Sequence, residues 1–382
     1  MTTAVSRVEV VRVEREHLPA LTEFYRRVWS PDATLPQVEA DRAAAALTNP
    51  ANPGAPPPTW LVLHAGHAIA HLTTIPIRIW LGGSNRPAHW LKGLWVLPEH
   101  QRSAAGFLVL KAAVAALDGV SLALVHEPAA IRLFKALGVT DLGALPNRLR
   151  LLRARALLGR LNPDTLGLGG LPSWTRAAMR LVRPTAPVLG PCIDGITALW
   201  ARAAGGTLGA LTMEITPECD RAGADALWAA VRLQLEAGSV RSGEYLSRRY
   251  GRGSEYSFVH VRARGTLVGI GVVKRPRADG DPRLSGIRIA TLSDIVCAPD
   301  SPGVGLEVLR GAERAARQFG ADALLCGVSH WSLQPLTRRR GYFKLPANLR
   351  VLARSVHDDE PLPGQLRDWW VTRGDSEGDG TF

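Results

Sequence analysis

The order of strand-like and helix-like patterns repeats once along this 382-residue chain, and this repetition constrains the fold more than any other feature. Each half begins with an alternating apolar segment and continues with two helical patterns, a run of antiparallel strands, a long helix, a buried strand and a short helix. The first copy spans residues 1–154 and the second spans 207–355. The length suits two domains better than one. We therefore expect two similar domains with mixed α/β sheets.

Two further segments lie outside the copies. Residues 155–206 are rich in Gly, Pro and Leu and show no clear period, which predicts a partly helical linker. Residues 356–382 are expected to form a C-terminal tail. Four arginines alternate with leucines where the first copy meets the linker, a pattern typical of a solvated edge strand; they are Arg148, Arg150, Arg153 and Arg155.

Three consecutive antiparallel strands form the centre of the first copy. Turn residues at Ala65-Gly66 and Gly82-Gly83 separate the alternating segments. The strands are predicted at Thr59–His64, His67–Leu81 and Arg86–Val96. The other elements of this copy are predicted at Val5–Val13, His17–Arg27, Pro36–Leu47, Ser103–Leu117, Ser121–Val125 and Pro128–Leu137.

The second copy is predicted from the same signals. A hairpin turn at Gly265-Thr266 joins two of its strands, and a long amphipathic helix follows the third. Its elements are predicted at Thr207–Ile215, Arg221–Leu235, Glu244–Tyr250, Ser257–Arg262, Leu267–Lys274, Ile287–Cys297, Gly303–Phe319, Ala323–Val328 and Leu333–Arg340.

Charge narrows the classes of partner without selecting one. The chain carries 46 basic and 34 acidic residues, a net charge of +12, and only five of the basic residues are lysines. Such a surface attracts phosphate groups of coenzymes and of nucleic acids alike. No arginine run is interleaved with aromatic residues, so we expect no nucleic-acid partner. No apolar stretch reaches the length of a membrane span and the N-terminus lacks a signal-peptide pattern, so we expect a cytoplasmic protein.

Cysteine and histidine spacing indicates no metal site. The four cysteines are scattered without a C-x-x-C pair and are expected to be buried reduced thiols; they are Cys192, Cys219, Cys297 and Cys326. His64, His67 and His71 cluster around a predicted turn, but strand alternation places them on different faces. We therefore expect no metal cofactor.

The segment between the third strand and the long helix of the first copy is the most informative for chemistry. It reads Val96-Leu97-Pro98-Glu99-His100-Gln101-Arg102-Ser103-Ala104-Ala105-Gly106. The first turn of a helix has free backbone N–H groups and the positive end of the helix dipole, and small residues let a pyrophosphate approach them. A tight structural turn is the alternative reading of such a loop.

This loop resembles the Arg/Gln-x-x-Gly-x-Gly/Ala loop of GCN5-related N-acetyltransferases (GNAT), with Gln101 and Gly106 at conserved positions and Ala104 in place of the first glycine. Residues 126–139 resemble the N-x-x-A-x-x-x-Y-x-x-x-G-F segment of the same family, although Glu127 replaces the asparagine and Phe134 the tyrosine that often acts as general acid. The resemblance implies two tandem acyl-CoA N-acyltransferase folds. It also implies acetyl-CoA or another acyl-CoA as co-substrate, bound by Leu94, Trp95, Val96, Gln101, Arg102, Ser103, Ala104, Ala105, Gly106, Phe107 and Phe134.

In such enzymes the amine attacks the thioester directly while backbone N–H groups near Leu94–Val96 bind the acyl carbonyl. The candidate bases that remove the amine proton are Glu127, His126 and His89. Each also has a structural explanation: Glu127 as a helix cap, His126 as a satisfied residue at a strand end, and His89 as a solvated side chain.

The second copy departs from the family pattern. Asp300 stands at the Arg/Gln position of its loop, where an acid repels phosphate, and Thr337 replaces the tyrosine. We therefore expect the second domain to be degenerate and acyl-CoA to bind the first.

Two segments of the second half, Arg241–Tyr250 (RSGEYLSRRY) and Asp368–Asp375 (DWWVTRGD), resemble elements of two-domain bacterial GNAT proteins found with cell-surface polysaccharide genes. This resemblance implies an N-acetyltransferase that acts on a small-molecule amine or an amino sugar. Trp90, Trp95, Trp369 and Trp370 are candidates to stack on a sugar ring, with core packing as the alternative. Two other functions stay open: an inactive CoA-binding or scaffold protein, and an aminoacyl-tRNA-dependent transferase on a related tandem fold. The sequence does not determine the oligomeric state.

Overall fold

The computed structural model describes residues 8–49, 51–52, 54–160, 184–197, 199, 211–251, 253–280, 286–356, 361–376 and 378. The chain forms two compact units, and neither is continuous in sequence. The first contains residues 1–144, 236–240 and 349–366; the second contains residues 145–235, 241–348 and 367–382. Each unit is built around one mixed sheet, so the predicted α/β fold class is confirmed.

The sheet of the first unit has the strand order β1-β2-β3-β4-β5-β15-β6, and β9 also pairs with β3. Antiparallel pairing prevails, and the exception is the parallel pair β4–β5. The strands are β1 Val8–Arg12, β2 Thr59–His64, β3 His67–Leu81, β4 Ser84–Val96, β5 Val120–Val125, β6 Thr140–Ala144, β9 Ala237–Ser239 and β15 Arg350–Ser355.

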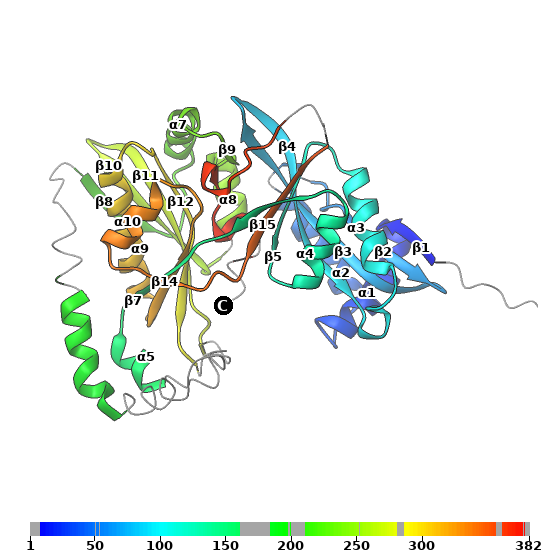
Figure 1. The fold of residues 1–382 in the computed structure, drawn as a ribbon, viewed down its shortest axis with the longest axis horizontal. Coiled ribbons are helices and arrows are strands. Elements are labelled where there is room, and N and C mark those ends of the chain that lie inside the picture. Colours follow the sequence, from blue (N-terminus) through cyan, green and yellow to red (C-terminus); the bar gives the residue numbers. More distant parts are fainter. Residues whose placement is uncertain are drawn as a thin grey trace, which may run out of the picture. The chain divides into compact units, whose positions relative to one another are not determined.

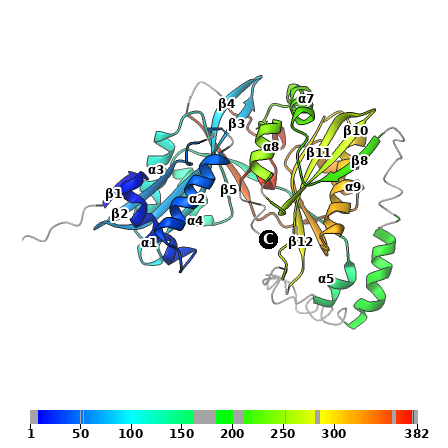
Figure 2. The ribbon, with the colours of Figure 1, turned by 180° about the vertical axis from the view of Figure 1, so that it is seen from behind.

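Helices cover both faces of this sheet (Figures 1 and 2). On one face, α1 (Leu18–Val28) and α2 (Leu35–Leu47) bury side chains that include Phe24 and Val38. On the other, α3 (Ala105–Ala116) and α4 (Pro128–Ala136) bury side chains that include Val109 and Phe134. Short 3-10 helices at Arg15–His17 and Pro98–His100 complete the unit. The helices α1 and α4 are amphipathic, with apolar residues at helical spacing toward the sheet, whereas α3 is apolar over most of its surface.

The sheet of the second unit has the order β14-β7-β13-β12-β11-β10-β8 and again contains one parallel pair, β12–β13. Its strands are β7 Asn147–Leu151, β8 Leu211–Thr216, β10 Tyr256–Ala263, β11 Thr266–Lys274, β12 Ile289–Cys297, β13 Ala323–Gly327 and β14 Phe343–Leu345, and the unit also contains the two-residue strand β16 Trp369–Trp370, which is not part of this sheet. Its helices are α5 Ala154–Arg160, a helix over 184–197, α7 Arg221–Val231, α8 Gly243–Tyr250, α9 Pro302–Gln318 and α10 Leu333–Arg339, with 3-10 turns at Arg232–Gln234 and Arg373–Asp375.

Two strands are exchanged between the halves of the chain. β7 comes from the first half and pairs with β13 and β14 of the second sheet. β15 comes from the second half and lies between β5 and β6 of the first sheet; Figure 1 shows it beside β5. The alternating patterns predict such strands but do not identify their partners.

The prediction of a solvated edge strand at the arginines is therefore wrong. β7 is an inner strand, and the Arg150 side chain is 1% exposed. Its guanidinium donates to the Thr197 carbonyl (2.8 Å) and lies 3.9 Å from the Glu313 carboxylate. An arginine on an inner strand is tolerated because these partners replace its lost hydration.

The cysteine prediction is partly wrong. Cys297 and Cys326 are buried, and burial raises the pKa of each thiol to about 12. Cys219 is half-buried and Cys192 is exposed. Among the described residues, no helix is long and apolar enough to cross a membrane, and no three His, Cys, Asp or Glu side chains gather as metal ligands would.

A glycine fixes the entry to β5. Gly119 has φ +72°, and a Cβ atom there would lie 2.0 Å from the Pro87 carbonyl oxygen. We expect Gly119→Ala to lower the free energy of unfolding by about 2 kcal/mol or more, because it combines left-handed strain with a backbone clash. Gly66→Ala is the matched control, since Gly66 has φ +82° with open space around it. Urea denaturation measures both, and equal losses would contradict the clash.

Candidate functional site

The parallel strands β4 and β5 separate partway along their length. They pair from Ala88 to Leu91 on β4 and from Val120 to Ala123 on β5. Gly93, with φ +62°, then forms a bulge opposite β3, where the pairing steps from Thr73–Lys92 to His71–Trp95. Beyond this point, no hydrogen bond between described residues joins residues 94–96 to residues 124–127. We call this opening the β4–β5 gap.

The loop that follows β4 leads from this gap into the N-terminus of α3. Within the described part of the chain, the backbone N–H groups of Arg102, Ala104, Gly106 and Phe107 have no hydrogen-bond acceptor. The side chains from Gln101 to Ala104 are exposed. A helix N-terminus with free N–H groups attracts anions, so the loop has the donors that a phosphate requires.

Two predicted cofactor contacts are buried. A Cβ atom on Gly106 would lie 3.1 Å from Val96 and 3.3 Å from Leu133, so this glycine allows α3 to pack closely on β4 and α4. Phe134 is 2% exposed and belongs to the core beneath α3 and α4. Both residues support the loop from inside the unit.

Glu127 and His126 lie at the end of β5, directly before α4. Both side chains are exposed, and neither has a hydrogen-bond partner among the described residues. Glu127 is the N-cap residue of α4, but its carboxylate makes no capping bond. The structure thus does not use this carboxylate as a helix cap.

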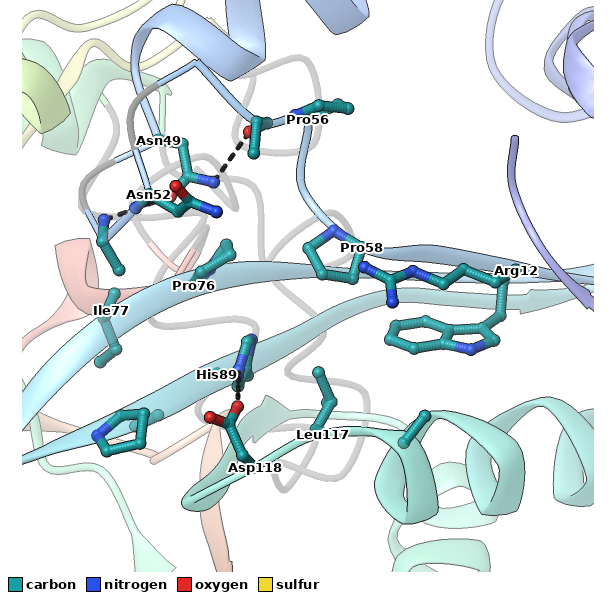
Figure 3. Close-up of a pocket in the computed structure, with 16 residues that line it drawn as sticks. Arg12, Asn49, Asn52, Pro56, Pro58, Pro76, Ile77, His89, Leu117 and Asp118 are labelled. Carbon is teal, nitrogen blue, oxygen red and sulfur yellow. Dashed lines mark hydrogen bonds and ion pairs between the residues drawn. The ribbon is translucent and has the colours of Figure 1, made fainter. Parts of the chain in front are cut away.

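His89 lies elsewhere, in a cavity of about 410 Å³. Figure 3 shows its imidazole facing Asp118, with Nε2 3.4 Å from the carboxylate; Arg12 and Asn49 also line the cavity. Burial lowers the pKa of His89 despite this acidic partner. Asp118 follows the C-terminus of α3, about 18 Å along the helix from the loop. The structure therefore does not bring His89 together with the loop, and the cavity contains none of the other predicted site residues.

Comparison with known proteins identifies the fold. No family model and no curated protein matches the sequence. Solved structures do match. One is a conserved protein of unknown function from Enterococcus faecalis V583, described as a probable N-acyltransferase, with TM-score 0.55 and 12% identity over 92% of this chain and 73% of that one. Another is a GCN5-related N-acetyltransferase from Anabaena variabilis, with TM-score 0.54 and 11% identity over 92% and 73%.

A third match is N-myristoyltransferase of Saccharomyces cerevisiae with bound myristoyl-CoA, at TM-score 0.54 and 11% identity over 97% of this chain and 90% of that one. The chain has a tandem GNAT fold. At identities of 11–12%, these matches show the fold of the chain and not its activity.

In the second unit, β12 and β13 form the equivalent parallel pair of the GNAT fold. They pair from Ile289 to Leu292 and from Ala323 to Cys326 and then separate. The extra residue Ser293 forms a bulge opposite β11, as Gly93 does opposite β3. Both units therefore have a bulged strand that leaves its parallel partner, and we call the second opening the β12–β13 gap.

The C-terminal segment, Trp369–Asp375, occupies the β12–β13 gap. The Trp370 indole donates to the Ile295 carbonyl on β12 (2.8 Å). On the other side, the Ser329 N–H beyond β13 donates to the Val371 carbonyl (2.9 Å), and Val328 forms a β-bridge with Thr372. A Cβ atom on Gly374 would lie 2.6 Å from the Ser293 carbonyl oxygen, so the segment fits closely against the bulge.

A buried ionic network anchors this segment. The Arg241 guanidinium donates to Asp294 and Asp375, each at 2.7 Å, and all three side chains are fully buried. The Tyr250 hydroxyl donates to Asp294 at 3.2 Å. Burial raises the pKa of Asp294 to about 6, although Arg241 opposes the shift. The network ties α8, β12 and the C-terminal segment together.

Asp300 lies at the start of α9, where the sequence places the acidic substitution. Its carboxylate accepts a hydrogen bond from the Gln234 side-chain amide (3.2 Å) and another from the Ser301 hydroxyl (3.1 Å). Asp300 thus places negative charge at the helix N-terminus that would meet a phosphate in the second unit.

His71 was considered in the sequence only as a metal ligand, and the structure gives it another setting. It lies on β3 beside the bulge and is 2% exposed. Phe24, Tyr25 and Trp29 contact its ring. No known motif marks this position in the sequence. The one local hint is that His71 stands two residues before the threonine pair Thr73-Thr74 in a mostly apolar strand. His64 and His67 do not share its environment, since His67 contacts Glu23 and the His64 ring faces His100.

The tryptophans predicted as sugar-stacking candidates divide into two groups. Trp90, Trp369 and Trp370 are at most 1% exposed, so they are core residues. Trp95 is 44% exposed and contacts Trp29, which is 47% exposed. Of the four predicted tryptophans, Trp95 is the one that can stack on a ligand without unfolding its surroundings.

Proposed function

We propose that the first unit is an acyl-CoA-dependent N-acyltransferase that binds its thioester in the β4–β5 gap. The observation that carries the proposal is the continuity of this gap with the anion-binding loop at the N-terminus of α3. The gap would take the extended chain between thioester and pyrophosphate, and the loop would take the phosphates. The yeast N-myristoyltransferase match, solved with myristoyl-CoA, supports acyl-CoA as the donor.

The residues have distinct roles in this proposal. The unpaired edge of β4 at Leu94, Trp95 and Val96 would offer backbone N–H groups to the acyl carbonyl and stabilise negative charge as the amine attacks. Gln101, Arg102 and Ser103 lie beside the phosphate position, while Ala104 and Ala105 leave room for the ligand. Phe107 and Phe134 would support the loop from the helix side.

Glu127 is the proposed base, with His126 as its neighbour and alternative. Both are exposed and unpartnered among the described residues, so either side chain is available to take the amine proton. His89 is the weakest of the three candidates because it lies at the opposite end of α3.

The second unit is proposed to be a non-binding partner domain. Its β12–β13 gap holds the chain's own C-terminal segment, and Asp300 repels phosphate at the corresponding loop. Residues 155–206 and 356–382 would then serve as linker and tail. Because most of the linker lies outside the described residues, its role stays a prediction.

The proposed acceptor is a small-molecule amine, and an amino sugar is the narrower candidate. The exposed Trp29–Trp95 pair supports a ring-bearing acceptor, because aromatic faces stack on sugar rings. Release of the CoA thiol, followed with a thiol reagent across a panel of amines that includes glucosamine, tests the function. Amine-dependent thiol release is expected, and its absence with every amine would favour the second candidate.

The second candidate function is an inactive CoA-binding or scaffold protein. The buried Phe134 favours it, because a phenyl ring supplies no proton to a departing thiolate. A thiol has an ordinary pKa of about 8.5, so the thiolate is a tolerable leaving group and water can protonate it. We therefore place the transferase first.

A further inference from the structure

One ring nitrogen of His71 makes a hydrogen bond, and the other has no hydrogen-bond partner among the described residues. Nδ1 lies 2.8 Å from the Gly93 carbonyl oxygen. Because a carbonyl only accepts, Nδ1 carries the hydrogen and Nε2 carries a lone pair. Nε2 is buried and, among the described residues, has no hydrogen-bond partner.

This arrangement is unusual for a residue that serves packing alone. A buried acceptor without a partner costs free energy, and an apolar or smaller side chain would avoid that cost. Burial lowers the pKa of His71 to about 4, and the positive charges of Lys92 and Arg42 act in the same direction. The ring is therefore neutral at physiological pH, and the Nε2 lone pair is always present.

His71 faces the side of the sheet opposite α3. Its neighbours Ala70 and Leu72 belong to the core beneath α3 and α4, and alternation along a strand turns His71 toward α1. There it stacks on Phe24 (ring centroids 5.6 Å apart) and meets the edge of Trp29 (5.1 Å). The loop and His71 thus lie near the bulge of β4 on opposite faces of the sheet.

We propose that Nε2 of His71 accepts a hydrogen bond from the amine that attacks the thioester, and that Trp29 and Trp95 form the entrance on the α1 face. The inference rests on the proposed function of the first unit. Trp29 meets the edge of the ring and is itself half exposed, so the proposal requires the Trp29 side chain to move when the amine reaches Nε2. The Nδ1 bond to Gly93 holds the imidazole at the bulge beside the acyl group.

The reaction balances without another reactant. The neutral amine uses its lone pair to form the new C–N bond, and the C–S bond of the thioester breaks. One proton leaves the nitrogen and one reaches the thiolate sulfur, so the products are an amide and the CoA thiol. His71 orients one N–H bond of the amine and keeps the nitrogen lone pair directed at the carbonyl carbon. The positive charges of Lys92 and Arg42 disfavour the ammonium form at this position.

Two substitutions distinguish the role of Nδ1 of His71 from that of Nε2. In His71→Asn the amide NH₂ can occupy the Nδ1 position and keep the Gly93 bond, but nothing replaces Nε2. In His71→Gln the amide reaches the Nε2 position and loses the Nδ1 position. We expect both variants to bind acetyl-CoA as the wild type does. His71→Asn should lose at least about tenfold in kcat/KM for the amine, and His71→Gln should recover part of that loss.

A spectroscopic measurement on the wild type keeps the test independent of variant folding. With ¹⁵N-labelled histidine and CoA present, addition of n-butylamine at alkaline pH should shift the Nε2 resonance of His71. An unshifted resonance, or a His71→Asn variant as active as the wild type, would overturn this inference and leave the proposed function standing. Failure of the wild type to bind acetyl-CoA would instead overturn the proposed function.

Discussion

Replacement of Arg241 by methionine should lower the free energy of unfolding of the second unit by about 3–5 kcal/mol, because it leaves two buried carboxylates without their cation. Asp294 and Asp375 each lie 2.7 Å from the guanidinium, and none of the three side chains is exposed. The loss should be seen by chemical denaturation, and hydrogen exchange should show early opening of residues 369–376. This is the largest stability effect that we expect in the chain.

Arg248→Met is the matched control for Arg241→Met. Arg248 lies on α8, the helix that begins just after Arg241, and pairs with Glu244 at the surface, with the two side chains 31% and 60% exposed. Such pairs contribute about 0.5 kcal/mol or less. Equal losses for the two variants would contradict the role of the buried network.

The pH dependence of the Arg241→Met variant follows from Asp294. Burial raises the pKa of this carboxyl to about 6, above its ordinary value. The protonated Asp294 carboxyl therefore contributes its full share to the free energy of unfolding below the ordinary carboxyl pKa. This contribution is lost as the pH rises through about 6. Without Arg241 the pKa rises further, so acidification should recover part of the lost stability.

Glu127→Gln should lower the turnover of the first unit by about 10²- to 10⁴-fold, the usual contribution of a general base. The affinity for acetyl-CoA should not change, because the loop and the gap are built from other residues. Thiol release under saturating acetyl-CoA measures the effect. Glu39→Gln, an exposed carboxylate on α2, is the control and should leave turnover unchanged.

His126→Gln decides between the neighbouring candidates. If Glu127 is the base, His126→Gln retains most of the turnover; if the losses are reversed, His126 takes that role. Wild-type turnover in Glu127→Gln would eliminate Glu127.

Local patterns predicted the individual elements well. β2 and β3 have the predicted bounds, and α9 begins one residue before its prediction. Both strands are buried over most of their length, and Gly-containing turns mark their ends. The same local signals predicted the helix N-terminus that carries the candidate phosphate loop.

Long-range pairing was not predictable from those signals. The alternation of apolar and polar residues in 147–151 and 350–355 does not show that the two strands exchange sheets. The sequence alone places each strand in the half of the chain that contains it. The sequence predicts a tail over residues 356–382, and within this segment Trp369–Asp375 fills the β12–β13 gap. Hydrophobic and ionic contacts far apart in sequence determine these placements.

In the candidate site, too, the local features are predictable from the sequence and the long-range contacts are not. The loop is predictable because its residues are contiguous, whereas the proposed role of His71 depends on a carbonyl on the neighbouring strand, 22 residues away. The position of His89 depends on the direction of α3 relative to β4, which no local pattern gives.

Calorimetric titration with acetyl-CoA tests the central claim, that the first unit alone binds the co-substrate through its loop. The wild type should bind one molecule per chain, Gln101→Asp should bind at least about tenfold more weakly because it copies the acid of the second loop, and Asp300→Gln should still bind one. Absence of binding to the wild type, two sites per chain, or unchanged affinity in Gln101→Asp would contradict the account.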